Sequence, residues 1–313
     1  MEKDSKIYVA GHSGLLGSAI VRKLEAEGYS DVITVSHGEL DLTDQRAASA
    51  FFDRERPEYV FLAAAKVGGI QANAAAPASF FYENLMISAN VIHAAYKNGA
   101  KKLLFFGSSC IYPRDCPQPI KEEYLLSDYL EKTNEGYALA KIAGLKMCAY
   151  YREQFGCGFI SCMPTNLYGP GDNFNLESSH VLPALIRKFH EAKARGHRTV
   201  AIWGSGRPRR EFMHVDDAAD AGLFLMNNYD GGEHVNVGTG RDVSIHELAH
   251  MLQAESGYEG ALVFDRSKPD GTPQKLLDVS KLNAMGWKSK IGLRDGVRQT
   301  MAWYAENAGG AAR

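Results

Sequence analysis

The chain has 313 residues, of which 45% are hydrophobic, so it can build one large α/β unit or two modest lobes around a substantial core. Its 35 basic and 37 acidic side chains give a formal net charge of −2, which argues against nucleic acid or an anionic membrane as the main partner. An anionic ligand would have to be bound by local groups.

Apolar runs alternate with segments of helical periodicity from the start of the chain. Residues 7–10 form an apolar run that ends at a glycine and predicts a buried strand, and Leu16, Ile20 and Leu24 then recur at helical spacing. Asp44 is placed to cap a helix that runs to about residue 56. The same reasoning predicts strands at 32–35, 60–63, 103–106 and 159–163, and helices at 80–98, 135–155, 180–195 and 216–227.

Strands that alternate with helices indicate βαβ units and a parallel sheet, and continuous apolar strands suit a sheet that is covered on both faces. We expect an α/β fold with a Rossmann-type doubly wound parallel sheet and a smaller α/β C-terminal substrate lobe. The pattern places the dinucleotide-binding domain at 1–170, joined by about 213–240, and the substrate-binding lobe at 171–212 and 241–313.

Gly11, Gly14 and Gly17 form a GxxGxxG pattern between the first predicted strand and the first predicted helix. Glycines allow a tight turn and the close approach of a pyrophosphate, and a helix N-terminus supplies free N–H groups with a partial positive charge. A glycine triplet alone is weak evidence, since an ordinary glycine turn explains it too. Its place at the start of a βαβαβ series favours dinucleotide binding.

Tyr137 and Lys141 lie one helical turn apart on one face, and Ser108 follows the fourth predicted strand. A phenol is a poor acid or base at neutral pH, and a nearby cation stabilises its phenolate. Ser108 would hold a substrate carbonyl oxygen beside Tyr137, and Lys141 would also bond the nicotinamide ribose. An exposed YxxxK pair is common by chance, but after a glycine loop and a serine-bearing strand the pattern favours a catalytic Ser–Tyr–Lys set.

Several further blocks occur in the order found in extended short-chain dehydrogenases/reductases and, more narrowly, in GDP-L-fucose synthases. The chain resembles that family nearly end to end, and the blocks are residues 63–70, 107–113, 163–169, 203–206, 210–217 and 267–271. The resemblance implies NADPH-dependent 3,5-epimerisation and 4-keto reduction of GDP-4-keto-6-deoxy-D-mannose to GDP-L-fucose.

In that family Cys110 and His180 would match the two acid–base residues of epimerisation. A ketone at C4 acidifies the protons on C3 and C5, and inversion needs a base on one face of the ring and an acid on the other. A thiolate and an imidazole can fill these roles. Without the family, a small buried hydrophobe and a helix-start histidine are the ordinary interpretations. The resemblance also implies that four residues hold the GDP-sugar: Lys188, Trp203, Arg210 and Asp270.

The expected cofactor is NADP(H), with NAD(H) as the alternative. Some family members carry arginine in the glycine loop and after the second strand, which suits a 2′-phosphate, whereas this chain has Ser13 and His37 there. Lys188 likewise stands where some relatives have arginine. Asp41 is placed to reach the adenine edge. The expected cofactor contacts are Gly11, His12, Ser13, Gly14, Leu15, Leu16, Gly17, His37, Asp41, Phe106, Gly107, Ser108, Ser109, Lys141, Pro164, Thr165, Asn166, Leu167 and His180.

Other functions stay open at this point. A different nucleotide 4-keto sugar, such as a GDP-linked 4-keto-6-deoxyheptose, would fit almost equally well, and a 4-epimerase of the same fold is a close competitor. A 4,6-dehydratase should carry a threonine and an acidic pair where this chain has Ser108, Ser109 and Cys110. A non-catalytic dinucleotide sensor would not need an intact Ser–Tyr–Lys set. The resemblance also implies a homodimer that packs through the YxxxK helix and the preceding long helix.

Two motifs point elsewhere. His246 and His250 complete an HExxH zinc-protease pattern, but Ser244 and Glu247 form a capping-box pattern at the same helix start, so we expect no metal. The basic residues of 207–210 are too few for a phosphate track, so we expect no nucleic acid.

The remaining features concern the compartment. Five cysteines without a CxxC pair predict reduced thiols, hence a cytoplasmic protein. No secretory segment and no membrane span are expected either, because the polar start leads directly into the first strand and no apolar run is long enough.

Overall fold

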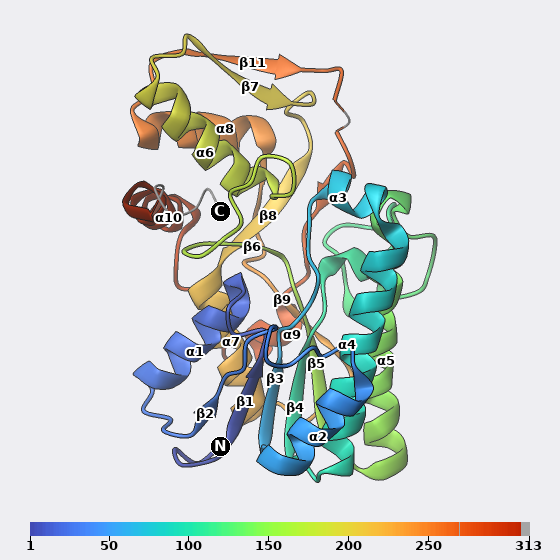
Figure 1. Ribbon diagram of the computed structural model, residues 1–313. Coiled ribbons are helices and arrows are strands. Elements are labelled where there is room, and N and C mark those ends of the chain that lie inside the picture. Colours follow the sequence, from blue (N-terminus) through green and yellow to red (C-terminus); the bar gives the residue numbers. More distant parts are fainter. Residues whose placement is uncertain (269, 308–313) are drawn as a thin grey trace.

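The large lobe is built on a parallel sheet. The computed structural model describes residues 1–268 and 270–307, and its six-stranded sheet has the order β2-β1-β3-β4-β5-β9 with every neighbouring pair parallel (Figure 1). The predicted Rossmann-type α/β fold is therefore confirmed. The strands are β1 (Ile7–Ala10), β2 (Val32–Ile33), β3 (Tyr59–Leu62), β4 (Lys102–Phe106), β5 (Gly158–Pro164) and β9 (Val235–Val237).

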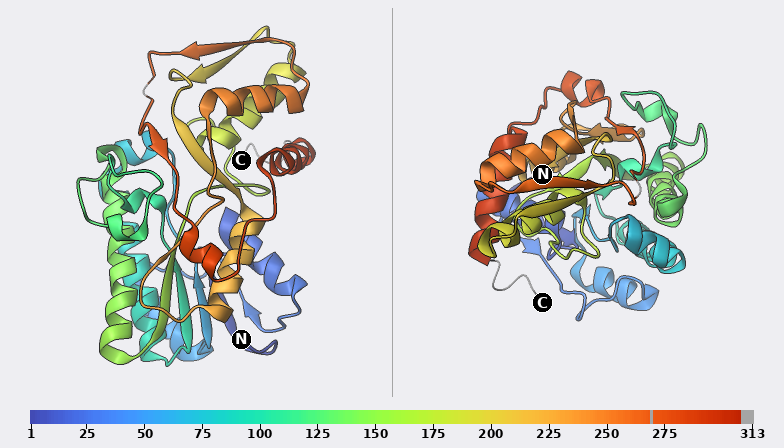
Figure 2. Two further views of the ribbon diagram at one scale, coloured as in Figure 1. Left: turned by 180° about the vertical axis from the view of Figure 1, so that it is seen from behind. Right: turned by 90° about the horizontal axis from the view of Figure 1, so that it is seen from above.

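Alternate residues of each strand enter two separate cores, because successive side chains point to opposite faces of a sheet. In β1, Ile7 and Val9 join one core and Tyr8 and Ala10 join the other. Helices cover both faces (Figure 2), which explains the continuous apolar runs in the sequence. One face carries α1 (Leu15–Ala26) and α7 (Val215–Asn228), and the other carries α2 (Gln45–Glu55), α4 (Pro77–Lys97) and α5 (Glu135–Phe155).

Local capping chemistry fixes several helix ends where the sequence predicted them. Asp44 accepts hydrogen bonds from the N–H groups of Arg46 and Ala47 at the start of α2. Helix α5 spans the predicted residues, and Gly156 ends it in the left-handed region at φ 68°.

None of the helices in the described residues combines the length and apolarity needed to cross a bilayer.

Two predicted boundaries are wrong, and one helix was not predicted. The second strand was expected at 32–35 but ends at Ile33, and the backbone N–H and hydroxyl of Ser36 then donate to the Glu39 carboxylate in a turn. Helix α4 starts at Pro77 rather than at residue 80, because proline suits the first helical position. A short helix, α3 (Ile70–Ala75), precedes it and was not predicted.

The smaller lobe surrounds a third core. Parallel strands β7 (Thr199–Trp203) and β11 (Ala261–Asp265) form its outer sheet, at the top of Figure 1. A second small sheet centres on β8 (Arg209–His214), which pairs with β6 (Asn166–Tyr168), β10 (Asp242–Ser244) and β12 (Gln274–Lys275). The helices around this core are α6 (Val181–Ala194), α8 (Ile245–Ser256) and α10 (Leu293–Asn307), which include the predicted helix at 180–195.

The predicted division of the chain between the lobes differs from the packing at β6, which pairs with β8 of the small lobe, and in the segment after β12. The sequence placed all of 241–313 in the small lobe. Helix α9 (Ser280–Ala284) instead contacts β9 of the large sheet, and Leu282 and Trp287 are buried in the core beneath α1 and α7. Apolar side chains in this segment complete the large core, so the chain returns to the large lobe before α10.

Glu211 links the two lobes at the centre of the molecule. Its side chain is fully buried in β8, and one carboxylate oxygen accepts hydrogen bonds from the backbone N–H groups of Thr239 at 2.5 Å and Gly240 at 2.8 Å. The other oxygen accepts from the N–H of Leu277 at 2.9 Å. Two segments, the loop after β9 and the segment after β12, are thereby fixed to one strand, since a buried carboxylate is stable only when it is well hydrogen-bonded.

Glu211→Ala should therefore lower the free energy of unfolding by about 3–5 kcal/mol, because it leaves three backbone N–H groups without a partner. Chemical denaturation followed by circular dichroism measures this. Glu247→Ala is the matched control: it removes an exposed glutamate from the α8 capping box and should cost at most about 1 kcal/mol. Equal losses in the two variants would contradict the linking role of Glu211.

Candidate active site

The candidate site lies at the carboxyl ends of the parallel strands. The glycine loop follows β1, Ser108 follows β4, and the segment 164–167 spans the end of β5 and the start of β6. Ligands of doubly wound α/β folds bind at this edge of the sheet. The predicted cofactor residues of these three segments are therefore brought together, although they lie far apart in the sequence.

The glycine loop makes a close turn in front of α1. Gly11 has φ 83°, and a Cβ atom at Gly17 would lie 2.0 Å from the carbonyl oxygen of Gly11, so only glycine fits at position 17. Gly14 is the N-cap of α1 and has no side-chain cap, while Nδ1 of His12 is buried without a hydrogen-bond partner among the described residues. These features fit a pyrophosphate that is held by helix N–H groups.

The loop after β2 carries the expected adenosine contacts, and its polar groups are already paired. Asp41 accepts hydrogen bonds from the backbone N–H and hydroxyl of Thr43, at 2.9 and 2.7 Å. His37 is exposed, and Glu39 is held by Ser36. The contacts expected from His37 and Asp41 stay predictions.

Ser108, Tyr137 and Lys141 meet as the sequence predicted. The Nζ atom of Lys141 lies 5.9 Å from the ring centre of Tyr137 and donates a hydrogen bond to the carbonyl of Phe106 at 2.9 Å. Burial lowers the pKa of Lys141 to about 8. Burial, and then the neighbouring Cys110, raise the pKa of Tyr137, although its hydrogen bond with Ser108 acts in the opposite direction. The phenol is therefore protonated at neutral pH, as a proton donor must be.

Cys110 lies beside this set, and two donors that the sequence analysis did not identify reach its sulfur. It is part of the short 3-10 helix η1 (Ser109–Ile111), and its backbone N–H donates to Oγ of Ser108 at 3.3 Å. Nδ2 of Asn134 lies 3.1 Å from Sγ, and Nζ of Lys275 lies 3.9 Å from it. Asn134 precedes Tyr137 by one helical turn, and this spacing could have identified it from the sequence. No such spacing marks Lys275, because its strand, β12, is only two residues long.

His180 is the N-cap residue of α6, where its side chain is exposed at the junction of the lobes. Crowding by protein atoms, and then the positive charge of Lys275, lower the pKa of His180. Lys275 thus faces both residues of the predicted acid–base pair. Cys110 lies in the large lobe and His180 in the small lobe, so the two side chains approach each other only when both lobes are folded and packed together.

The four expected substrate residues gather in the small lobe around β7 and β8. Nζ of Lys188 lies 5.1 Å from the ring centre of Trp203, which is 44% exposed. Asp270 accepts hydrogen bonds from the N–H and hydroxyl of Ser205, at 2.6 and 2.8 Å. Burial lowers the pKa of Arg210, while Cys110 and Asp270 raise it, so Arg210 is close to both. These residues form a surface with cations and an aromatic face.

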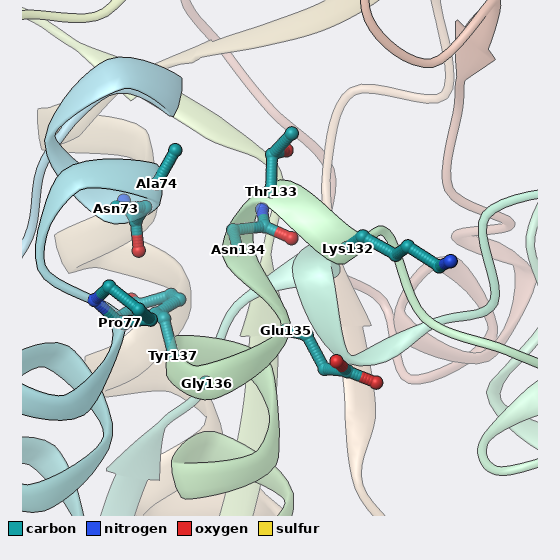
Figure 3. Close-up of a pocket in the computed structure, with 9 residues that line it drawn as sticks. All are labelled: Asn73, Ala74, Pro77, Lys132, Thr133, Asn134, Glu135, Gly136 and Tyr137. Carbon is teal, nitrogen blue, oxygen red and sulfur yellow. The ribbon is translucent and has the colours of Figure 1, made fainter.

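A pocket of about 270 Å³ opens next to Tyr137 (Figure 3). Asn73 and Ala74 of α3 face Thr133 and Asn134 across it, and Oδ1 of Asn73 is buried without a partner among the described residues. The sequence analysis did not predict this pocket, because it did not predict α3, which provides part of the lining. Its lining consists of Asn73, Ala74, Pro77, Lys132, Thr133, Asn134, Glu135, Gly136 and Tyr137.

The two histidines of the HExxH pattern lie on α8, in the small lobe. Their ring centres are 4.5 Å apart, and His246 stacks on Phe264. The capping box of Ser244 and Glu247 is confirmed. Within residues 1–268 and 270–307, no group of three or more metal-ligating side chains is found.

The sequence profile of the NAD-dependent epimerase/dehydratase family matches residues 7–238. The chain belongs to this family. GDP-L-fucose synthase 1 of Arabidopsis thaliana is 58% identical to it over 306 residues, which cover 98% of this chain and 95% of that one. The resemblance inferred from the sequence blocks is thereby confirmed.

Solved structures of family members superpose on nearly the whole chain. A GDP-L-fucose synthetase from Naegleria fowleri with bound NADP has a TM-score of 0.93 at 30% identity, over 100% of this chain and 98% of that one. A GDP-mannoheptose C4 reductase from Campylobacter jejuni with bound NADP has a TM-score of 0.90 at 44% identity, over 97% of this chain and 99% of that one. The epimerase/dehydratase fold thus extends over both lobes.

The glycine loop yields a test that separates folding from cofactor binding. Gly17→Ala should lower the thermal midpoint by about 5 °C or more, because its Cβ would overlap the Gly11 carbonyl. Gly14→Ala is the control, since its Cβ would meet nothing closer than 3.4 Å; it should keep the midpoint but weaken NADPH binding by about tenfold or more. Thermal melts and fluorescence titration measure the two effects, and unchanged binding by Gly14→Ala would contradict the assignment.

Proposed function

We propose that this protein converts GDP-4-keto-6-deoxy-D-mannose to GDP-L-fucose by 3,5-epimerisation followed by NADPH-dependent reduction of the 4-ketone. The observation that carries the proposal is the position of Cys110, next to the Ser108–Tyr137–Lys141 set and facing the same ammonium group as His180. A simple ketoreductase needs only the Ser–Tyr–Lys set. A thiol and an imidazole at the same place add the acid–base pair that inversion requires.

The residues present fit NADP(H). The glycine loop and the N-terminus of α1 would hold the pyrophosphate, Lys141 the nicotinamide ribose, and residues 164–167 the nicotinamide edge. The bound cofactor supplies the hydride for C4. Residues 32–43 contain no lysine or arginine, so His37 and Ser13 would have to meet the 2′-phosphate, and NADH is the alternative hydride donor.

Epimerisation uses groups of this chain alone. The C4 ketone acidifies the C3 and C5 protons; Cys110 as thiolate takes the proton from one face, and the electron pair moves into the ketone as an enolate. His180 as imidazolium returns a proton to the opposite face. Ser108 and Tyr137, at the carbonyl, would hold the developing oxyanion by hydrogen bonds.

Reduction follows at the same carbonyl. Tyr137 donates its proton to the C4 oxygen as the hydride arrives, and the ammonium group of Lys141 stabilises the resulting phenolate. The burial that raises the pKa of Tyr137 keeps it protonated until this step. Lys188 and Arg210 would neutralise the diphosphate, Trp203 would provide an aromatic face, and Asp270 a hydrogen-bond acceptor.

Reduction or epimerisation of a GDP-linked 4-keto heptose is the second candidate. The Campylobacter jejuni heptose reductase is 44% identical to this chain, compared with 58% for the Arabidopsis thaliana fucose synthase. The higher identity to the fucose synthase favours a GDP-linked 4-keto-6-deoxyhexose as the substrate. The intact catalytic set argues against a non-catalytic sensor, and Cys110 in place of an acidic pair argues against a dehydratase.

Turnover of GDP-4-keto-6-deoxy-D-mannose in deuterated water with NADPH or NADH, read by NMR, tests the division of labour. Tyr137→Phe should slow cofactor oxidation by about 100-fold or more and leave deuterium exchange at C3 and C5 largely intact. Cys110→Ala should slow exchange by a similar factor. Tyr150→Phe, on the same helix, and Cys157→Ala are the matched controls and should behave as wild type.

The outcomes separate the candidates. Oxidation of NADPH without deuterium in the product would make the protein a plain ketoreductase. No reaction with this sugar but turnover of a GDP-4-keto heptose would establish the second candidate. Loss of both activities in folded Tyr137→Phe would contradict the proposed roles.

We also infer a cytoplasmic homodimer that packs through α4 and α5. Five cysteines are free in the structure, in keeping with a reducing compartment. Large apolar side chains are exposed along the outer sides of these two helices, which cover the sheet beside α2 (Figure 1). They are Phe81 (38% exposed), Tyr82 (59%), Leu139 (42%), Tyr150 (59%) and Phe155 (45%).

The double variant Tyr82→Glu/Tyr150→Glu should therefore be a monomer, because two buried carboxylates per subunit oppose association. Light scattering coupled to size-exclusion chromatography gives the mass. Val263→Glu places the same charge on an apolar side chain that is 49% exposed in the small lobe, and it should remain a dimer. A wild-type protein of monomeric mass would refute the assembly.

A further inference from the structure

The sulfur of Cys110 is surrounded by positive and hydrogen-bond-donating groups. Nδ2 of Asn134 lies 3.1 Å from Sγ and Nζ of Lys275 lies 3.9 Å from it. Arg210 lies opposite Lys275 in the pairing of β8 with β12, and Cys110 acts to raise its pKa, against the effect of burial. A donor or cation beside a cysteine favours the thiolate, which is the form that accepts a proton from carbon.

The position of Lys275 is fixed by its backbone. Strand β12 is parallel to β8, with Lys275 opposite Arg210. On the C-terminal side, the N–H of Leu276 donates to Oε1 of Gln118 at 2.8 Å and the N–H of Leu277 donates to Glu211. On the N-terminal side, the Gln274 side chain donates to Asp242 at 2.6 Å. The lysine therefore extends from a segment that is tied down on both sides.

The charge of Lys275 is available to the sulfur. In the described part of the chain Lys275 forms no ion pair, since no carboxylate oxygen lies within 4.0 Å of its Nζ. Other lysines are neutralised by a carboxylate, as Lys281 is by Glu233 and Lys66 is by Glu83. Lys275 also affects His180, whose pKa is lowered first by crowding from surrounding protein atoms and then by this ammonium group.

We propose that Lys275 and Asn134 are positioning residues that keep Cys110 as the thiolate and aim its sulfur at the substrate ring. This inference rests on the proposed function, in which Cys110 is the base. In the step, the C–H bond at C3 or C5 breaks, an S–H bond forms, and the electron pair enters the C4 carbonyl as an enolate. His180 imidazolium then supplies the proton for the new C–H bond on the opposite face as the electron pair returns from the enolate to carbon. The thiol then releases its proton to water and the imidazole takes one up from water, which restores the pair for the second centre.

Alkylation of Cys110 by iodoacetamide at pH 7 tests the thiolate without any substrate, with peptide mass spectrometry to separate Cys110 from the other thiols. Lys275→Met should slow this alkylation by about tenfold or more, and Lys275→Arg should restore most of it. Asn134→Asp, which keeps the shape but places a carboxylate beside the sulfur, should also slow it. Lys121→Met, the same substitution at an exposed lysine on the neighbouring segment, should alkylate as wild type does.

A second readout follows the catalytic step. Deuterium exchange at C3 and C5 should fall by a similar factor in Lys275→Met at saturating substrate, which a mere loss of diphosphate binding would not produce. Wild-type alkylation in folded Lys275→Met overturns this inference. Exchange that survives in Cys110→Ala overturns the proposed function instead, and the effect of Lys275 on the thiol would remain measurable in that case.

Discussion

The buried carboxylate of Glu211 is the interaction on which the arrangement of the two lobes depends. It is part of β8 in the small lobe, yet its partners are the loop after β9 of the large sheet and Leu277, two residues beyond β12. Its own backbone carbonyl accepts hydrogen bonds from the side chains of Thr165 and Asn166, where the chain passes from one sheet to the other. One side chain thus fixes the segments that bring Arg210 and Lys275 to Cys110.

The site concentrates positive charge in a chain whose formal net charge is −2. Lys141, Arg210 and Lys275 lie around one thiol and one phenol, and burial lowers the pKa of the first two. Burying several cations together costs free energy when no anion is near, and an anionic group such as a diphosphate, an enolate or a phenolate offsets this cost. The local positive charge therefore favours an anionic ligand at this site.

Much of the fold could be predicted from the sequence, because the large sheet follows periodicity and capping rules. The apolar runs of β1, β3, β4 and β5 and the Asp44 cap are local signals. The length of β2, helix α3 and the return of Leu282 and Trp287 to the large core were not predictable, since they depend on distant partners. The sequence motifs predicted five residues of the site: Ser108, Tyr137, Lys141, Cys110 and His180. Lys275 was not predictable, because it lies 165 positions from Cys110 in the sequence and is placed beside it by the pairing of β12 with β8.

The groups proposed for reduction and those proposed for epimerisation come from different parts of the architecture. Ser108 follows β4, and Tyr137 and Lys141 lie on α5, so this set belongs to the large lobe alone. His180 and Lys275, which are proposed to act with Cys110, lie on segments of the small lobe. The set proposed for reduction therefore needs only the large lobe. The proposed acid–base pair needs the junction of the two lobes, so a change in how the lobes pack would separate Cys110 from His180 and Lys275 while leaving Ser108, Tyr137 and Lys141 in place.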